Sequence, residues 1–184
     1  MQFHTLIVMG VSGCGKSSVA QQLVDSLGWT LHEGDAYHSE ANVTKMRKGV
    51  ALTDEDRADW LARLVRLLAD TAQAAPEDGV VLTCSALKRK YRDQLRDGQA
   101  PRAVGFVFLD LDYPTALQRV RARASHFFSP ELVASQFATL ERPDNEPGVL
   151  TVDATLPLTD IVQQVSHWMG AAAATNTEHQ ERQP

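Results

Sequence analysis

The chain has 184 residues, of which 43% are hydrophobic and 22% charged, a usage typical of one globular domain with its own core. Its formal net charge of −5 argues against a nucleic-acid-binding protein, and no apolar run is long enough to cross a bilayer. The two cysteines, Cys14 and Cys84, match neither a disulfide framework nor a metal-binding spacing, so a reducing, cytoplasmic location is expected.

Strand and helix patterns alternate along most of the sequence. Apolar, partly β-branched segments predict strands at residues 5–9, 29–32, 79–84, 104–110 and 149–153. Helices are predicted at residues 16–27, 39–48, 54–74, 88–97, 113–123, 130–140 and 157–169. This alternation predicts an α/β fold in which helices cover both faces of a parallel sheet. We expect one domain over residues 1–170 and a disordered tail over 171–184, which lacks apolar periodicity.

The first strand leads into a segment that fits the phosphate-binding pattern G-x-x-x-x-G-K-[ST], and a predicted helix follows it. Glycines let the backbone wrap around a phosphate, and the helix N-terminus adds partial positive charge. Lys16 can reach the outer phosphates of a nucleotide, and the Ser17 hydroxyl can ligate Mg²⁺. We therefore expect a nucleoside triphosphate to bind Gly10, Val11, Ser12, Gly13, Cys14, Gly15, Lys16, Ser17 and Ser18.

A polar segment, residues 32–38, follows the second strand. Carboxylates just beyond the carboxyl end of such a strand point into the ligand crevice of a doubly wound sheet. Asp35 can accept a proton from a substrate hydroxyl or orient that hydroxyl, and Glu33 can hold a water on Mg²⁺. The competing interpretation is a polar loop in which Asp35 closes an Asx turn. A metal site of His32, Asp35 and His38 is disfavoured because no fourth ligand is evident.

Small residues and then a group of basic residues follow the third strand. No aspartate ends this strand, so the second acidic metal ligand of many P-loop proteins is missing there. We therefore expect Ser17, Glu33 and water to hold the metal. Lys88, Arg89 or Arg92 can hold an anionic group of a substrate, although a solvated helix face explains any one of them equally well.

Two arginines, Arg119 and Arg123, lie four residues apart and share a face of the helix predicted at 113–123. A basic helix end that runs into a loop suits a lid, at about residues 119–135, that closes over ATP. An arginine there can neutralise charge on the transferring phosphoryl group while closure excludes water. A charged outer helix face is the alternative.

Several blocks of the sequence together resemble the bacterial-type gluconokinase family of small P-loop kinases. The resemblance covers about residues 5–168, and its most specific blocks are Cys84-Ser85-Ala86-Leu87-Lys88 and Ser135-Gln136-Phe137-Ala138-Thr139-Leu140-Glu141. The other matching residues are Gly10 to Ser18, Gly34, Asp35, His38, Asn42, Lys45, Met46, Gly49, Leu52 to Arg57, Trp60, Arg89, Tyr91 to Asp93, His126 and Phe127. The chain departs from the family at Ser39, Ala51 and Asp59, where proline is usual, and at Ala124-Ser125, where lysine-glycine is usual.

The resemblance implies a P-loop kinase fold with a five-stranded parallel sheet, a helical lid and a substrate-binding region at about residues 33–60, commonly in a homodimer. The implied activity is the ATP-dependent phosphorylation of D-gluconate to 6-phospho-D-gluconate, which enters the pentose phosphate pathway, with Mg²⁺ as the metal. Lys16, Asp35 and Arg123 would then be the catalytic residues, and Arg119 would bind the nucleotide.

The gluconate carboxylate suits an arginine, because two N–H groups of the guanidinium meet its two oxygens. Arg57 and Arg89 are the candidates for this contact, with His38 and Lys88 nearby. Residues 153–157, which follow the last strand, are expected to line the adenine edge of the nucleotide.

Two other classes of protein remain open. One is another small-molecule kinase of the same fold, such as a shikimate kinase or a nucleoside monophosphate kinase. The polar region 33–60 suits a hydroxy acid but does not by itself select gluconate. The other is a non-catalytic NTP-dependent switch, which the absence of an Asn-Lys-x-Asp guanine motif disfavours.

Overall fold

A computed structural model describes residues 3–74, 78–100, 102–122 and 130–180, with side chains up to residue 171. Its strands form a parallel sheet in the order β2-β3-β1-β4-β5. Their bounds are β1 Thr5–Met9, β2 Thr30–Glu33, β3 Val80–Thr83, β4 Val104–Asp110 and β5 Val149–Asp153. The predicted parallel sheet is therefore confirmed, and each strand lies within one or two residues of its predicted range.

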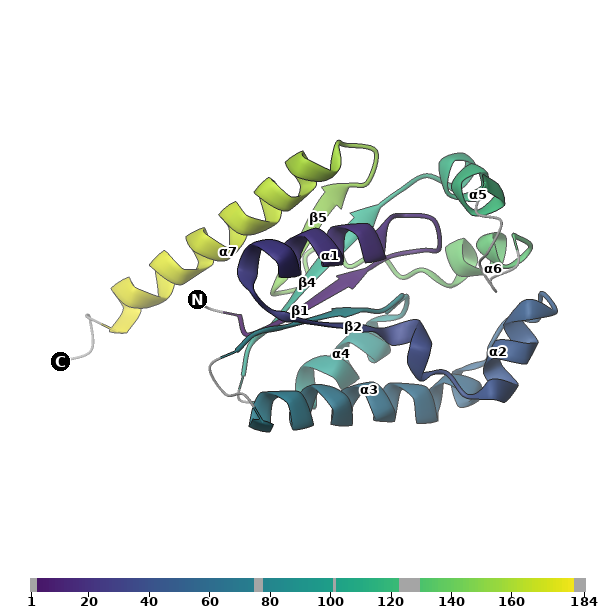
Figure 1. The fold of residues 1–184 in the computed structure, drawn as a ribbon, viewed down its shortest axis with the longest axis horizontal. Coiled ribbons are helices and arrows are strands. Elements are labelled where there is room, and N and C mark those ends of the chain that lie inside the picture. Colours follow the sequence, from purple (N-terminus) through teal and green to yellow (C-terminus); the bar gives the residue numbers. More distant parts are fainter. Residues whose placement is uncertain (1–2, 75–77, 101, 123–129, 181–184) are drawn as a thin grey trace.

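The helices cover the sheet on both faces and gather at the carboxyl ends of its strands (Figure 1). Their bounds are α1 Lys16–Leu27, α2 Glu40–Arg47, α3 Asp54–Ala74, α4 Arg89–Asp97, α5 Tyr113–Ala122, α6 Leu132–Thr139 and α7 Leu158–Gln180, with a short 3-10 helix, η1, at Gly34–Tyr37. Helices α1 and α7 cover one face and α3 and α4 the other, while α2, α5 and α6 lie at the end where the strands finish. The winding reverses at β1, which places a ligand crevice at its carboxyl end.

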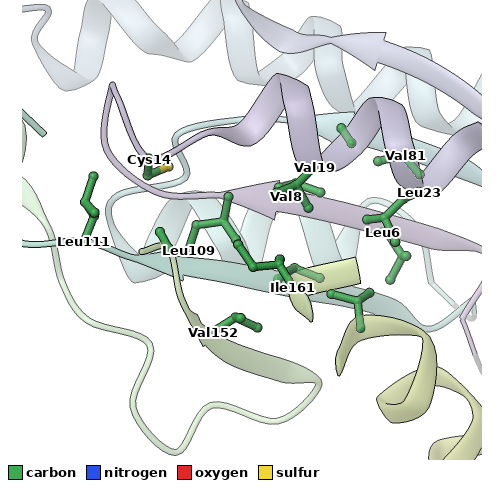
Figure 2. Packing of buried hydrophobic residues seen from close by; sticks show 14 of the residues in the cluster. Leu6, Val8, Cys14, Val19, Leu23, Val81, Leu109, Leu111, Val152 and Ile161 are labelled. Atoms are coloured by element: carbon green, nitrogen blue, oxygen red, sulfur yellow. The ribbon is translucent and has the colours of Figure 1, made fainter. Parts of the chain in front are cut away.

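The buried strand β1 supplies both halves of the core, because successive side chains of a strand point to opposite faces. Leu6 and Val8 pack in a cluster with α1 and α7, whereas Ile7 and Met9 pack in a second cluster with α3 and α4. Figure 2 shows the first cluster, with Val19 and Leu23 of α1 over Val8 and Leu6. Each fully buried aliphatic side chain contributes about 1.5–3 kcal/mol to folding, so β1 and the loop that follows it sit on a firmly packed base.

A third, small apolar cluster lies away from the sheet. It joins Met46 at the end of α2, Leu52 before α3 and Leu132 at the start of α6, with Val43 packed against it. This contact brings two segments that are far apart in the sequence together beside the crevice.

The last helix differs from the sequence-based expectation. A disordered tail was expected from residue 171, but the backbone of α7 stays helical to Gln180. The alanines at 171–174 explain the extension, since alanine has the highest helix propensity of all residues. Among the described helices, none combines the length and the hydropathy that crossing a membrane requires.

Candidate active site

The phosphate loop, residues 10–17, connects β1 to α1 and is shaped by its glycines. Gly13 has a φ of 88°, and a Cβ there would lie 2.7 Å from the carbonyl oxygen of Ala116, so α5 packs directly against the loop. Among the described residues no side chain caps the N-terminus of α1. Its first N–H groups therefore remain available to an anion, as the sequence predicts.

Lys16 lies folded back over this loop. Its ammonium Nζ donates to the carbonyl oxygens of Gly10 and Val11, at 3.1 Å each. These are neutral acceptors, so a phosphate oxygen can replace them at little cost and gains a charge-assisted hydrogen bond. Cys14 is buried beneath the loop (Figure 2), and burial raises the pKa of its thiol, so it serves as a small packing residue.

An acceptor-side pocket opens next to the phosphate loop. It is lined by Ser12, Lys16, Asp35, His38, Met46, Ala51, Leu52, Arg57, Trp60, Ser85, Leu132, Ser135 and Gln136. The structure thus brings together the predicted phosphate-binding lysine, the predicted acceptor carboxylate and two predicted substrate-binding residues. We call this space the acceptor pocket.

Asp35 reaches the pocket from η1, directly after β2. The approach requires glycine at position 34, because a Cβ there would lie 2.2 Å from the carbonyl oxygen of Thr83. The backbone carbonyl of Asp35 accepts from the N–H of His38 at 3.4 Å, but its carboxylate accepts no hydrogen bond from any described residue. The Asx-turn interpretation is therefore wrong, and the carboxylate is available to a ligand.

His38 forms one wall of the acceptor pocket. Its ring stacks on Trp60, with ring centroids 4.3 Å apart and planes 15° apart, and the indole Nε1 of Trp60 donates to the carbonyl oxygen of Gly34 at 2.8 Å. Burial lowers the pKa of His38 to about 4, against an opposing effect of Asp35, so the imidazole is neutral at pH 7. Its Nδ1 is buried without a hydrogen-bond partner among the described residues, which leaves a polar atom for a ligand to satisfy.

Of the described arginines, Arg57 lines this pocket. Its Nη1 donates to the carbonyl oxygens of Leu52 and Thr53, the latter at 3.4 Å, and its guanidinium lies 6.0 Å from the centre of the Tyr91 ring. These contacts fix the guanidinium at the first turn of α3, at the edge of the space that also contains Asp35.

The other candidate cations lie elsewhere. Lys88 forms an ion pair with Asp54 at 2.8 Å, and hydrogen bonds from Lys88, Lys90 and Tyr91 hold the pKa of Asp54 well below its usual range. Arg89 is exposed at the start of α4, with its Nε 3.7 Å from Asp93. Neither Lys88 nor Arg89 lines the acceptor pocket.

Arg92, the third basic residue that the sequence offered for an anion, is buried instead. Its Nε donates to Glu146 at 3.0 Å, its Nη2 pairs with the same carboxylate at 2.5 Å, and its Nη1 donates to the carbonyl of Ala86 at 2.8 Å. Arg92 therefore serves the fold and not a ligand.

The two predicted metal-supporting residues differ in their surroundings. Ser17 is exposed at the first turn of α1. Glu33, at the end of β2, accepts from the hydroxyl of Thr83 at 2.5 Å, and that hydroxyl in turn accepts from the N–H of Gly34 at 3.3 Å. Hydroxyl and carboxylate oxygens are the hard donors that Mg²⁺ prefers, and Mg²⁺ commonly binds one or two such groups together with phosphate and water. No cluster of three or more His, Cys, Asp or Glu suited to a metal occurs within the described ranges.

A second cleft, of about 410 Å³, lies on the other side of the phosphate loop. It is lined by Gly13, Cys14, Gly15, Ser18, Val19, Arg119, Ala122, Ala154, Leu156, Leu158 and Ile161. Arg119 donates to the carbonyl oxygen of Ala154 at 3.1 Å, which ties α5 to the segment after β5. Part of the predicted adenine edge, at Ala154 and Leu156, therefore shares a cleft with the loop. Arg123 and residues 124–129 of the predicted lid lie outside the described residues.

Some pocket residues received no role from the sequence. Trp60 and Gln136 belong to the blocks quoted for the family resemblance, and Ser85 is a small residue just beyond the carboxyl end of β3. Its position just after a strand could have identified Ser85 as a candidate site residue. Helix α6, by contrast, approaches the loop from far along the chain, and no local pattern predicts that contact.

Comparison with known proteins identifies relatives along most of the chain. The AAA domain family matches residues 6–143. A gluconokinase of Gluconobacter oxydans (strain 621H) is 48% identical over 147 residues, which cover 80% of this chain and 80% of the relative. The thermoresistant gluconokinase of Escherichia coli (strain K12) is 39% identical over 162 residues, 86% of this chain and 89% of the relative. The crystal structure of a gluconokinase from Sinorhizobium meliloti 1021 is 38% identical, covers 100% of both chains and has a TM-score of 0.80.

Proposed function

The chain belongs to the gluconokinase family of P-loop kinases, and we propose that it transfers the γ-phosphoryl group of ATP to the 6-hydroxyl of D-gluconate. The observation that carries this proposal is the acceptor pocket, which Lys16 of the phosphate loop shares with Asp35, His38 and Arg57. Direct transfer requires the phosphoryl donor and the acceptor hydroxyl to meet within one space, and most of the barrier reduction comes from holding them there.

In the proposed reaction, the bond between the γ-phosphorus and the ADP oxygen breaks as a bond to the gluconate O6 forms. The hydroxyl proton passes to Asp35, whose carboxylate accepts no hydrogen bond from the described residues. Lys16 leaves the carbonyls of Gly10 and Val11 and binds the phosphate oxygens, where its charge offsets the negative charge of the transferring group.

The other pocket residues give the acceptor its orientation. Arg57 binds the carboxylate at the far end of gluconate, and its contacts with the Leu52 and Thr53 carbonyls fix its position. The neutral ring of His38, with its unpartnered Nδ1, exchanges a hydrogen bond with a hydroxyl along the sugar-acid chain. An arginine at one end and a carboxylate at the other match a substrate that carries an acid and a terminal hydroxyl.

The nucleotide is proposed to occupy the cleft formed by the loop, Arg119 and the segment around Ala154, while Arg123 acts from the lid. Ser17 and Glu33 would hold Mg²⁺, directly or through water. The ion supplies positive charge to the phosphate oxygens when bound. A homodimer and a cytoplasmic location also stay predictions.

An acceptor screen tests the proposal against the other kinases of this fold. Purified protein with MgATP should release ADP with D-gluconate far faster than with glucose, shikimate, glycerate or nucleoside monophosphates. Phosphorus–proton correlation by NMR should then show the new phosphate ester at C6. Equal ADP release with and without gluconate would instead support an NTP-dependent switch, and faster release with shikimate or a nucleotide would assign another acceptor.

A further inference from the structure

A glutamine from helix α6 reaches across the acceptor pocket to the phosphate loop. The side-chain Oε1 of Gln136 accepts from the backbone N–H of Ser12 at 2.6 Å, across 124 positions of sequence. Within the loop, the N–H groups of Gly10 and Cys14 donate to backbone carbonyls, whereas that of Ser12 donates to a side chain that also lines the acceptor pocket. Gln136 thus lies at the boundary between the phosphate loop and the acceptor pocket.

Contacts at both ends of α6 hold Gln136 in this position. At the start of the helix, Leu132 packs with Met46 and Leu52 in the third apolar cluster. Just after the helix, the N–H of Glu141 donates to the carbonyl of Leu87 at 2.8 Å, and its carboxylate accepts from the N–H of Arg89 at 2.7 Å. The contact with Ser12 is therefore a fixed feature of the packed fold.

The chemistry of the contact also sets which way the amide of Gln136 faces. Since the Ser12 N–H is a donor, the carbonyl oxygen of the amide must point toward it, and the NH₂ group must point away from it. No residue in the described part of the chain accepts a hydrogen bond from this NH₂ group. Two amide protons are thus left for an oxygen that the described residues do not supply.

We propose that Gln136 is a further catalytic residue for phosphoryl transfer. Its Oε1 holds the loop at Ser12, and its Nε2 donates to an oxygen of the phosphoryl group as that group passes from the nucleotide to the acceptor hydroxyl, whose proton goes to Asp35. The amide is a neutral donor. It therefore adds one hydrogen bond to the phosphoryl oxygens, while Lys16 supplies positive charge there. This inference rests on the proposed kinase function.

A Gln136→Glu variant separates the two halves of the amide. A glutamate oxygen can still accept from Ser12, but the ionised side chain has no proton to donate and repels a phosphoryl oxygen. We expect kcat for gluconate to fall by about 100-fold or more at pH 8, the usual effect of losing one donor to a transition-state oxygen. Gln136→Met, which keeps the size but neither hydrogen bond, should lose at least as much.

The pH dependence of Gln136→Glu gives a readout that a merely structural role does not move. When its carboxyl is protonated, the variant regains an O–H donor, so its kcat relative to wild type should rise as the pH falls from 8 to 5. Lys16, Asp35, His38 and Arg57 also face this pocket and are common to both proteins, so the wild-type profile over the same pH range is the reference. Gln94→Glu, the same change at an exposed site on α4, serves as the matched control and should keep wild-type kinetics.

The outcomes distinguish this inference from the proposed function. Wild-type kcat in Gln136→Glu, or a reduced kcat whose ratio to wild type is constant from pH 8 to 5, would overturn the role of Gln136 alone. A wild-type protein without gluconate-dependent ADP release would overturn the proposed function and this inference with it. Circular dichroism melts of each variant verify that folding is retained, and Gln136→Met carries the test if the glutamate variant does not fold.

Discussion

Replacing Asp35 by asparagine separates acceptor chemistry from nucleotide binding. The change keeps the size of the side chain but removes its ability to take a proton, so gluconate turnover should fall by roughly 100- to 10,000-fold. That range corresponds to about 3–5 kcal/mol of transition-state stabilisation. Because the carboxylate of Asp35 accepts no hydrogen bond from the described residues, the variant should lose less than about 0.5 kcal/mol of folding stability.

ATP affinity should change little in Asp35→Asn, because Lys16 and the loop glycines are untouched. The assay pairs calorimetric titration of ATP with steady-state gluconate turnover on one preparation, and thermal unfolding measures stability. Asp70→Asn, at an exposed site on α3, is the matched control. Unchanged turnover would remove Asp35 from the reaction. Loss of ATP binding together with turnover would assign it to the metal and nucleotide, and the base would lie elsewhere.

Three further variants test the remaining assignments. Lys16→Met should lower kcat about 100-fold or more with an unchanged melting temperature, and near-normal turnover in a folded protein would refute its role. Arg57→Lys should raise KM for gluconate about 10-fold by losing the bidentate contact, whereas Arg89→Lys should not; the reverse result would make Arg89 the carboxylate ligand. Arg92→Met should cost up to about 3–5 kcal/mol at pH 7 in thermal unfolding, because it leaves the buried carboxylate of Glu146 with only the more distant Arg96, at 3.5 Å. Arg92 lowers the pKa of Glu146 in the folded state, so this stabilisation is present at neutral pH and disappears as the pH falls through the lowered pKa. The two melting curves should therefore converge in acid, and a gap that persists there would mean that the ion pair contributes little.

The elements that carry the fold were predictable because their signals are local. The run Thr5–Met9 is β-branched or apolar at every position and precedes a glycine-rich loop, so both the strand and its burial follow from the sequence. The 3-10 helix at Gly34–Tyr37 was missed, since its single turn carries no periodicity. The end of α7 was missed because alanine propensity continues the helix after its apolar stripe has ended.

The site was predictable only in part, because its geometry depends on contacts between distant segments. Lys16 and Asp35 follow parallel strands that end at the same edge of the sheet, so their presence in one crevice could be deduced. The position of Lys88 outside the pocket could not be deduced, because it depends on an ion pair with Asp54. The bond between Gln136 and Ser12 depends on where α6 packs, and no spacing in the sequence encodes that.

The register of the central strand also bears on how the protein is made. Thr5 lies opposite Val80 on one side and Val104 on the other, so β1 finds its second neighbour only after β2, β3 and the helices between them have been synthesised. Such distant pairings make folding slow compared with local ones. A nascent chain that stops short of β4 already contains every residue of the phosphate loop but lacks α5, against which Gly13 packs. Nucleotide can therefore assist folding only late in synthesis, and the exposed edge of β1 is the surface that a chaperone would need to cover until then.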